Sequence, residues 1–141
     1  MRTSSFLIAG VATAMILLSA CTKTDTFILS VSDAENIIPG SYKVATFIDI
    51  AGEGTVYENY IFQFTSNGDL TATDGTDTYT GTWSIENEND PVYDKKVTIS
   101  IGGNTEMDVL NHGWLVEEVT DATLYLTDDT GVESVHFVAL S

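Results

Sequence analysis

From residue 40 to the C-terminus the chain is a series of short alternating segments separated by turn residues, and this pattern restricts the fold most. Between Thr78 and Glu86, for example, apolar and aromatic residues alternate with threonine and serine, as in a strand with one buried face. Clusters of Gly, Asn and Asp separate the segments and are typical of tight turns. The alternation predicts strands over 41–50, 57–65, 70–73, 78–86, 95–101, 114–120, 123–127 and 132–140, with a weak one over 107–110.

Eight or nine short strands joined by short loops predict an antiparallel meander. Because a flat sheet of that size would leave two unpaired edges, we expect it to close on itself. The predicted fold is therefore all-β, a small antiparallel up-and-down β-barrel of about eight strands, with a β-sandwich as the alternative. Trp83 lies in the middle of a strand and is expected in the core. Gly40 and Gly81 each precede an aromatic residue by two positions, and we expect each glycine to leave room for that ring.

The first twenty residues have the pattern of a secretory signal. One arginine precedes an apolar run from Phe6 to Leu18, which is shorter than a membrane-spanning helix needs. The run ends in Leu-Ser-Ala-Cys, which resembles the bacterial lipobox. We therefore expect residues 1–20 to be removed and Cys21 to become the lipid-bearing N-terminus, held to a membrane by acyl chains.

The rest of the chain divides into a tether and a barrel domain. Residues 21–37 are expected to form the tether, with a short helix near its end that stops at Pro39-Gly40. Residues 38–141 are expected to form the barrel. The chain carries 21 acidic and 5 basic residues, a formal net charge of −16, which excludes nucleic acid as a partner. The expected location is a bacterial outer membrane or cell surface, with the acidic body standing off the lipid headgroups.

Four segments, 37–44, 62–70, 79–85 and 114–126, follow one another in an order and spacing typical of a known family. They resemble the lipocalin-like domains of lipoproteins from Bacteroides-type gut bacteria. The resemblance covers residues 37 to 141, and Tyr42 takes the place of a tryptophan in the family's opening motif. It implies a β-barrel-like fold and a binding role with no reaction attached to it.

Catalysis and cofactor chemistry are not expected. The histidines, His112 and His136, lie outside any nucleophile motif, and the single cysteine leaves no zinc-binding cluster. No metal site is predicted. Calcium is a weaker alternative that would use acidic turn residues, although these do not follow the EF-hand spacing and are typical of solvated hairpin tips. The candidate calcium ligands are Asp74, Asp77, Asp128 and Asp129.

The predicted function is binding of an unknown ligand by a lipid-anchored envelope protein. The candidate ligand-binding residues are Trp114, His112 and Tyr42. Trp114 follows the turn at Asn111-His112-Gly113, so we expect it to lie half in the core and half at the barrel rim. The partner would be a small apolar ligand held inside the barrel. The alternative is a module with a filled core and no internal ligand, which would dock a protein or a glycan.

Overall fold

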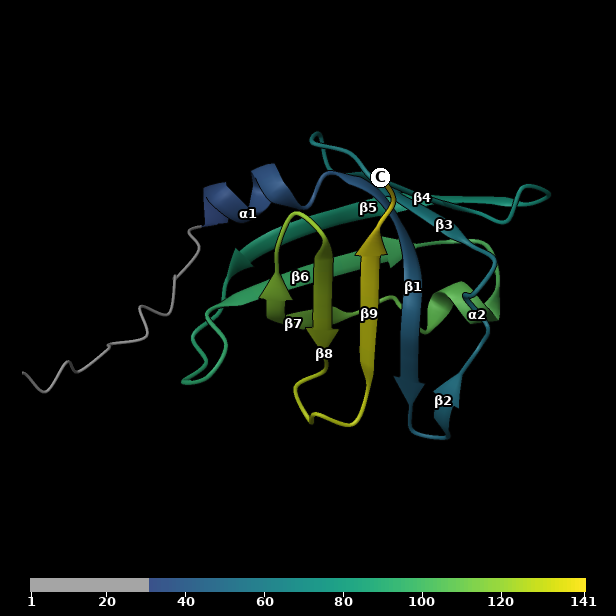
Figure 1. Ribbon diagram of the computed structural model, residues 1–141. Helices are drawn as coiled ribbons and strands as arrows, with labels where there is room; N and C mark the ends of the chain where they lie inside the picture. The colour runs from purple at the N-terminus through teal and green to yellow at the C-terminus, as the bar shows by residue number, and fades with distance from the viewer. Residues whose placement is uncertain (1–30) are drawn as a thin grey trace, which may run out of the picture.

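The protein, described here by a computed structural model over residues 31–141, is a closed antiparallel β-barrel with two short helices (Figure 1). The elements in chain order are α1 (Val31–Ile37), β1 (Gly40–Asp49), β2 (Gly52–Gly54), β3 (Ile61–Phe64), β4 (Asp69–Thr73), β5 (Thr78–Asn87), β6 (Lys95–Ile101), α2 (Thr105–Asp108), β7 (Gly113–Val119), β8 (Thr123–Thr127) and β9 (Ser134–Ala139).

Strand β1 pairs with both β2 and β3, consecutive strands pair from β3 to β9, and β9 returns to pair with β1. Strand β1 pairs with β3 through its first half and with β9 along most of its length, with a register shift between Val44 and Thr46. The predicted up-and-down barrel of about eight strands is confirmed. The β1–β9 pairing closes one continuous sheet, whereas a sandwich would consist of two separate sheets. The sequence did not predict β2, a three-residue strand that pairs with the end of β1.

Aromatic rings fill the barrel interior. Phe64 contacts Trp83 and Phe137 edge to face, with ring centroids 5.7 and 5.6 Å apart. Phe137 contacts Phe62 at 5.3 Å, and Tyr57 lies 6.0 Å from Phe62. Such edge-to-face pairs add to the stability gained from burial alone. The rings therefore form a continuous chain through the interior, and Trp83 is a core residue as predicted, with 6% of its surface exposed.

Helix α1 lies at the barrel end where β1 begins (Figure 1). It occupies the place where the sequence predicts a short helix, and it packs against β5. Ala34 and Ile38 are completely buried in the core, and the Tyr42 hydroxyl donates a hydrogen bond to the Ile38 carbonyl at 2.9 Å. The packed body therefore extends back from the barrel into the helix that precedes it.

Helix α2 closes the other end, where the sequence predicted a weak strand over 107–110. That prediction is wrong. Asn104 caps the helix by accepting a hydrogen bond from the Met107 amide, and Met107 and Leu110 bury their side chains at helical spacing. The Tyr57 hydroxyl also donates to the Glu106 carbonyl, which ties α2 to the loop before β3.

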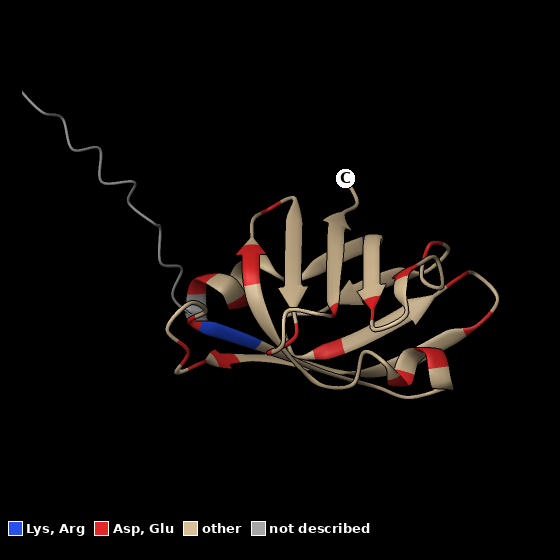
Figure 2. Cartoon of the chain, turned by 90° about the horizontal axis from the view of Figure 1, so that it is seen from below, with Lys and Arg blue, Asp and Glu red and all other residues tan. Residues whose placement is uncertain are grey.

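Acidic residues are spread over many loops and strand ends, whereas basic residues are few (Figure 2). The lysines of the described part are Lys43, Lys95 and Lys96. Lys95 is buried and its ammonium group lies 2.8 Å from the carboxylate of Asp94. Within residues 31–141, no helix has the length and apolar character needed to cross a bilayer.

Candidate functional site

The structure places two of the three candidate ligand-binding residues, Trp114 and Tyr42, in the core. Trp114 is completely buried, and its indole nitrogen donates to the Leu110 carbonyl at 3.0 Å. Tyr42 is 2% exposed and contacts Phe64 and Phe137 inside the barrel. The predicted rim position of Trp114 is therefore wrong, because the α2 connection covers the barrel end beside it. Of the three residues, His112 alone reaches a surface, with about a third of its side chain exposed.

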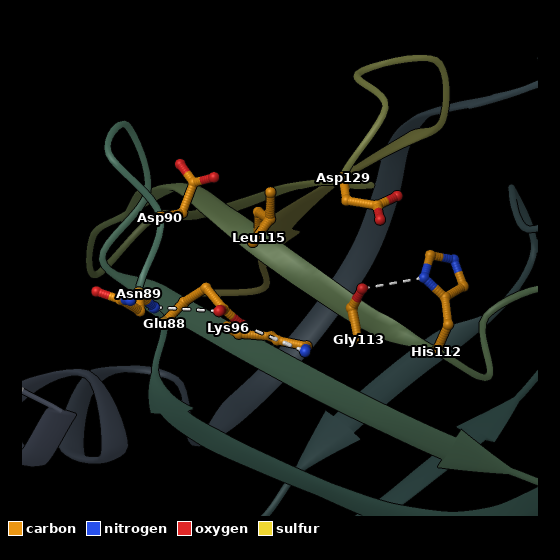
Figure 3. A pocket seen from close by; sticks show the side chains of 8 residues that line it. All are labelled: Glu88, Asn89, Asp90, Lys96, His112, Gly113, Leu115 and Asp129. Carbon is orange, nitrogen blue, oxygen red and sulfur yellow. Dashed lines mark hydrogen bonds and ion pairs between the residues drawn. The ribbon is translucent and has the colours of Figure 1, made fainter.

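His112 borders a hollow of about 460 Å³ on the outer wall of the barrel. This volume is within the range of small-molecule sites. The hollow lies over β6 and β7, between the β5–β6 loop and the β8–β9 loop (Figure 3). Its lining residues are Glu88, Asn89, Asp90, Lys96, His112, Gly113, Leu115 and Asp129.

The short pairing of β6 with β7 determines which side chains form the floor of the hollow. Lys96 pairs with Leu115, and both face outward because the neighbouring pair, Val97 and Trp114, faces the core. A side chain at Gly113 would collide with Lys96, since an added Cβ would lie 2.2 Å from the Lys96 Cε atom. Gly113 thus lets Lys96 lie across the strand, where its ammonium group is 3.3 Å from the Glu88 carboxylate.

The His112 ring is held in one orientation. It stacks on Trp114 with ring centroids 3.9 Å apart, and Nδ1 lies 3.1 Å from the Gly113 carbonyl. Because a carbonyl only accepts hydrogen bonds, Nδ1 carries the proton and Nε2 of the neutral ring is an acceptor. Nε2 is buried, makes no hydrogen bond with the described residues, and lies 3.8 Å from a carboxylate oxygen of Glu133. A protonated ring forms an ion pair with Glu133, whereas a neutral ring presents a second acceptor to the carboxylate.

Asp128 fixes the β8–β9 loop, which carries Asp129 to the hollow and Glu133 to His112. Its carboxylate accepts hydrogen bonds from the amides of Val132 and Glu133 at 2.8 and 2.9 Å and from the Thr130 hydroxyl. Burial raises the pKa of Asp128, but these hydrogen bonds to the charged form outweigh it, so the pKa is below its usual range. The carboxylate is thus occupied in shaping the loop.

Two further turns are closed by carboxylates in the same way. In the β5–β6 loop, Asp90 accepts from the amides of Val92 and Tyr93 at 2.8 and 2.9 Å through one oxygen. Asp74 accepts from two amides of the β4–β5 turn. Backbone hydrogen bonds lower the pKa of both groups. Across residues 31–141, no three His, Cys, Asp or Glu side chains converge to hold a metal ion.

Sequence reasoning selected His112 together with Trp114, and Asp129 as a calcium alternative, but not the other charged residues nearby. Lys96, Glu88 and Glu133 come from different elements, and their proximity depends on the short β6–β7 pairing and on the β8–β9 loop. The one local signal was Gly113, whose missing side chain marks a close approach by another group. Cys21 lies outside the described residues.

The fold belongs to the class of small lipocalin-like barrels. The chain is similar to the crystal structure of a lipocalin-like protein from Bacteroides uniformis, with a TM-score of 0.50 and 14% identity over 72% of this chain and 97% of the other. It is also similar to a protein of the DUF4847 family from Bacteroides vulgatus, with a TM-score of 0.50 and 14% identity over 74% and 94% of the two chains. No protein-family model and no curated protein sequence matches the chain. At this identity the likeness defines the fold alone.

Proposed function

We propose that this protein is a lipid-anchored binding protein of the bacterial envelope that takes its ligand in the hollow on its outer wall, without catalysing a reaction. The observation that carries the proposal is the filled interior. The rings from Trp83 through Phe64, Phe137 and Phe62 to Tyr57 occupy the space where a lipocalin-like barrel could hold an apolar ligand. The lateral hollow, by contrast, offers polar groups in a preformed cavity.

A binding role is supported by the surroundings of His112. A general base needs a nucleophile within hydrogen-bond reach, and the buried Nε2 atom of His112 has no hydrogen-bond partner among the described residues. Membrane attachment and envelope location are supported by the sequence, in which Cys21 follows a signal-length apolar run.

An apolar fluorescent dye, anilinonaphthalene sulfonate, tests whether the interior binds ligand. We expect the native protein to leave dye fluorescence unchanged, and the dye to respond only when urea begins to expose the core. Stoichiometric dye binding to the native protein, with quenching of tryptophan fluorescence, would show an open interior and contradict the proposal. Unchanged dye fluorescence is also the result expected for the alternative from the sequence, a module with a filled core that docks a protein or a glycan.

A further inference from the structure

Exposed aliphatic side chains surround one lysine on the outer wall of the barrel. Lys43 of β1 is in register with Ile61 of β3 on one side and with Val138 of β9 on the other. Leu140 extends β9 beyond its last residue, because its amide donates to the Ser41 carbonyl at 2.7 Å. Between 36% and 40% of the surface of Ile61, Val138 and Leu140 is exposed. The Lys43 patch consists of Lys43, Ile61, Val138 and Leu140.

Among the residues that the structure describes, no carboxylate pairs with the ammonium group of Lys43. Each lysine of β6, by contrast, has a carboxylate within ion-pair distance. The outward-facing strand residues around Lys43 also include no acid. They are Thr46, Tyr125 and His136 in one row, Ile61, Thr73, Thr123 and Val138 in the row of Lys43, and Ser41, Gln63 and Thr71 in the next. The wall around Lys43 is therefore free of negative charge in a chain with 21 acidic residues.

A partner for the Lys43 patch has to supply negative charge over Lys43 and take up the aliphatic side chains around it. A second copy of this chain fails the first condition, because a two-fold interface at this place would bring two Lys43 ammonium groups together. A bilayer surface meets both conditions. Its phosphates lie above the acyl region, and a lysine at that depth buries its carbon stem while its ammonium group reaches the phosphates.

The Lys43 patch lies within reach of the expected lipid anchor. Helix α1 leads directly into β1, and the end of β9 lies beside the start of β1 at the same end of the barrel (Figure 1). Ten residues, 21–30, come between the expected lipid and α1, and ten residues span at most about 35 Å. Anchoring therefore holds the patch near the bilayer at a high effective concentration, so weak contacts are enough to orient the barrel.

We propose that the Lys43 patch lies on the bilayer that holds the lipid anchor, with the Lys43 ammonium group among the phosphates. The inference rests on the lipid attachment proposed above. It replaces the expectation from net charge that the whole body stands off the headgroups, because the rows around Lys43 carry no carboxylate. In the closed sheet, three strands separate β1 from β6 in either direction, β3 to β5 on one side and β7 to β9 on the other. The hollow over β6 and β7 therefore faces away from the membrane.

A fluorophore placed in the patch tests this orientation. The full-length chain with Ile61→Cys is produced as a lipoprotein and labelled with nitrobenzoxadiazole. It is then reconstituted in vesicles of phosphatidylethanolamine and phosphatidylglycerol that contain a nitroxide lipid. The dye reacts at residue 61, because the expected lipid occupies the Cys21 sulfur. We expect the nitroxide to quench the dye strongly at residue 61. The matched control is Ser100→Cys on β6, an exposed position of the opposite wall, where quenching should be absent.

A charge reversal tests the role of the lysine. With the dye at residue 61, Lys43→Glu should weaken docking by at least about tenfold, because it changes the charge at the phosphates by two units. Ser100→Glu adds negative charge on the opposite wall, beyond the screening length at physiological salt, and should change docking by less than about twofold. Thermal unfolding confirms that each variant is folded.

Several results would overturn the inference. Equal quenching at residues 61 and 100, or quenching at residue 61 that Lys43→Glu leaves unchanged, would show that the patch does not orient the barrel. Shielding of the dye at residue 61 without lipid, rising with protein concentration, would assign the patch to a second copy. Shielding that requires other envelope proteins would assign it to a protein partner.

The same vesicles separate this inference from the proposed function. A wild-type chain that does not float with the vesicles would contradict lipid attachment itself. A chain that floats with the vesicles but shows no quenching at residue 61 would refute the orientation alone and leave the lipid attachment in place.

Discussion

Replacing Gly81 by alanine should disrupt the pairing of β5 with β6. A Cβ atom at Gly81 would lie 2.0 Å from the Ser100 carbonyl oxygen and 2.6 Å from the Ile101 Cα atom, and both obstacles are backbone. Carbon and oxygen need about 3.3 Å even in a close contact, so the two strands would have to separate locally by more than about 1 Å. This reason differs from the sequence interpretation, which assigned the space at Gly81 to an aromatic ring. At Gly40 the Tyr42 ring does lie over the glycine, but an added Cβ atom would be 3.5 Å from the ring, an ordinary van der Waals distance, so the ring does not require a glycine there either.

The expected loss of unfolding free energy is about 2–6 kcal/mol. It combines about two broken ladder hydrogen bonds at 0.5–1.5 kcal/mol each with about 1–3 kcal/mol of overpacking. With a urea dependence of about 1–3 kcal/mol per molar, the midpoint of urea unfolding should fall by about 2 M. The change is measured by tryptophan fluorescence, since Trp83 is on the same strand.

Gly102→Ala is the matched control. It adds the same methyl group, but nothing lies within 4 Å of the new atom. Its effect should lie between zero and about 1 kcal/mol of stabilisation, because alanine restricts the unfolded chain more than glycine does. Unfolding midpoints within about 0.3 M of each other for the two variants would refute the argument that backbone approach at Gly81 determines the cost.

Four further predictions follow from the same structure. Trp114→Ala should lower the free energy of unfolding by about 3–5 kcal/mol, as much as Trp83→Ala, because both indoles are buried. A clearly smaller loss for Trp114 in urea unfolding would indicate a position at the barrel rim. Asp128→Asn should lower the free energy of unfolding by about 1–2 kcal/mol at neutral pH. Because the pKa of Asp128 is lowered in the folded protein, its stabilising contribution is present above about pH 4 and is lost as the pH falls, so the stability of the variant should decrease less on acidification than that of the wild type. Burial, and after it the charges of Glu106 and Asp49, raise the pKa of Tyr57, so the stabilising contribution of its neutral hydroxyl is present below about pH 10 and is lost at higher pH. In an alkaline titration, the phenolate absorbance of Tyr57 should appear above the ordinary tyrosine pKa and together with unfolding. Ordinary titration of every tyrosine in the folded protein would contradict this. When expressed in a bacterial host, the Cys21→Ser variant should no longer be found in the membrane fraction. Processing and fractionation that are unchanged from the wild type would refute lipid attachment.

The sequence by itself determined the class of fold. Alternation along segments such as 78–86, with turn residues between them, required antiparallel strands, and the need to avoid exposed edges favoured a closed barrel over a sandwich. These signals are local, so they can be seen without the tertiary structure. They also placed the short helix before Pro39 and the core position of Trp83. The capping signal at Asn104 was local as well, but the apolar residues Met107 and Leu110 also suited a short strand, and packing against the barrel end decided for a helix.

Only the tertiary structure decided where a ligand could bind. Burial of Trp114 depends on the connection that carries α2, which lies over the barrel end and cannot be predicted from the residues beside the tryptophan. The approach of Glu133 to His112 joins two loops that are far apart in sequence. The register of β6 against β7, which turns Lys96 and Leu115 to the outside, is fixed by three residue pairs. Contacts of this kind depend on how the closed sheet brings distant segments together, and no local pattern in the chain encodes them.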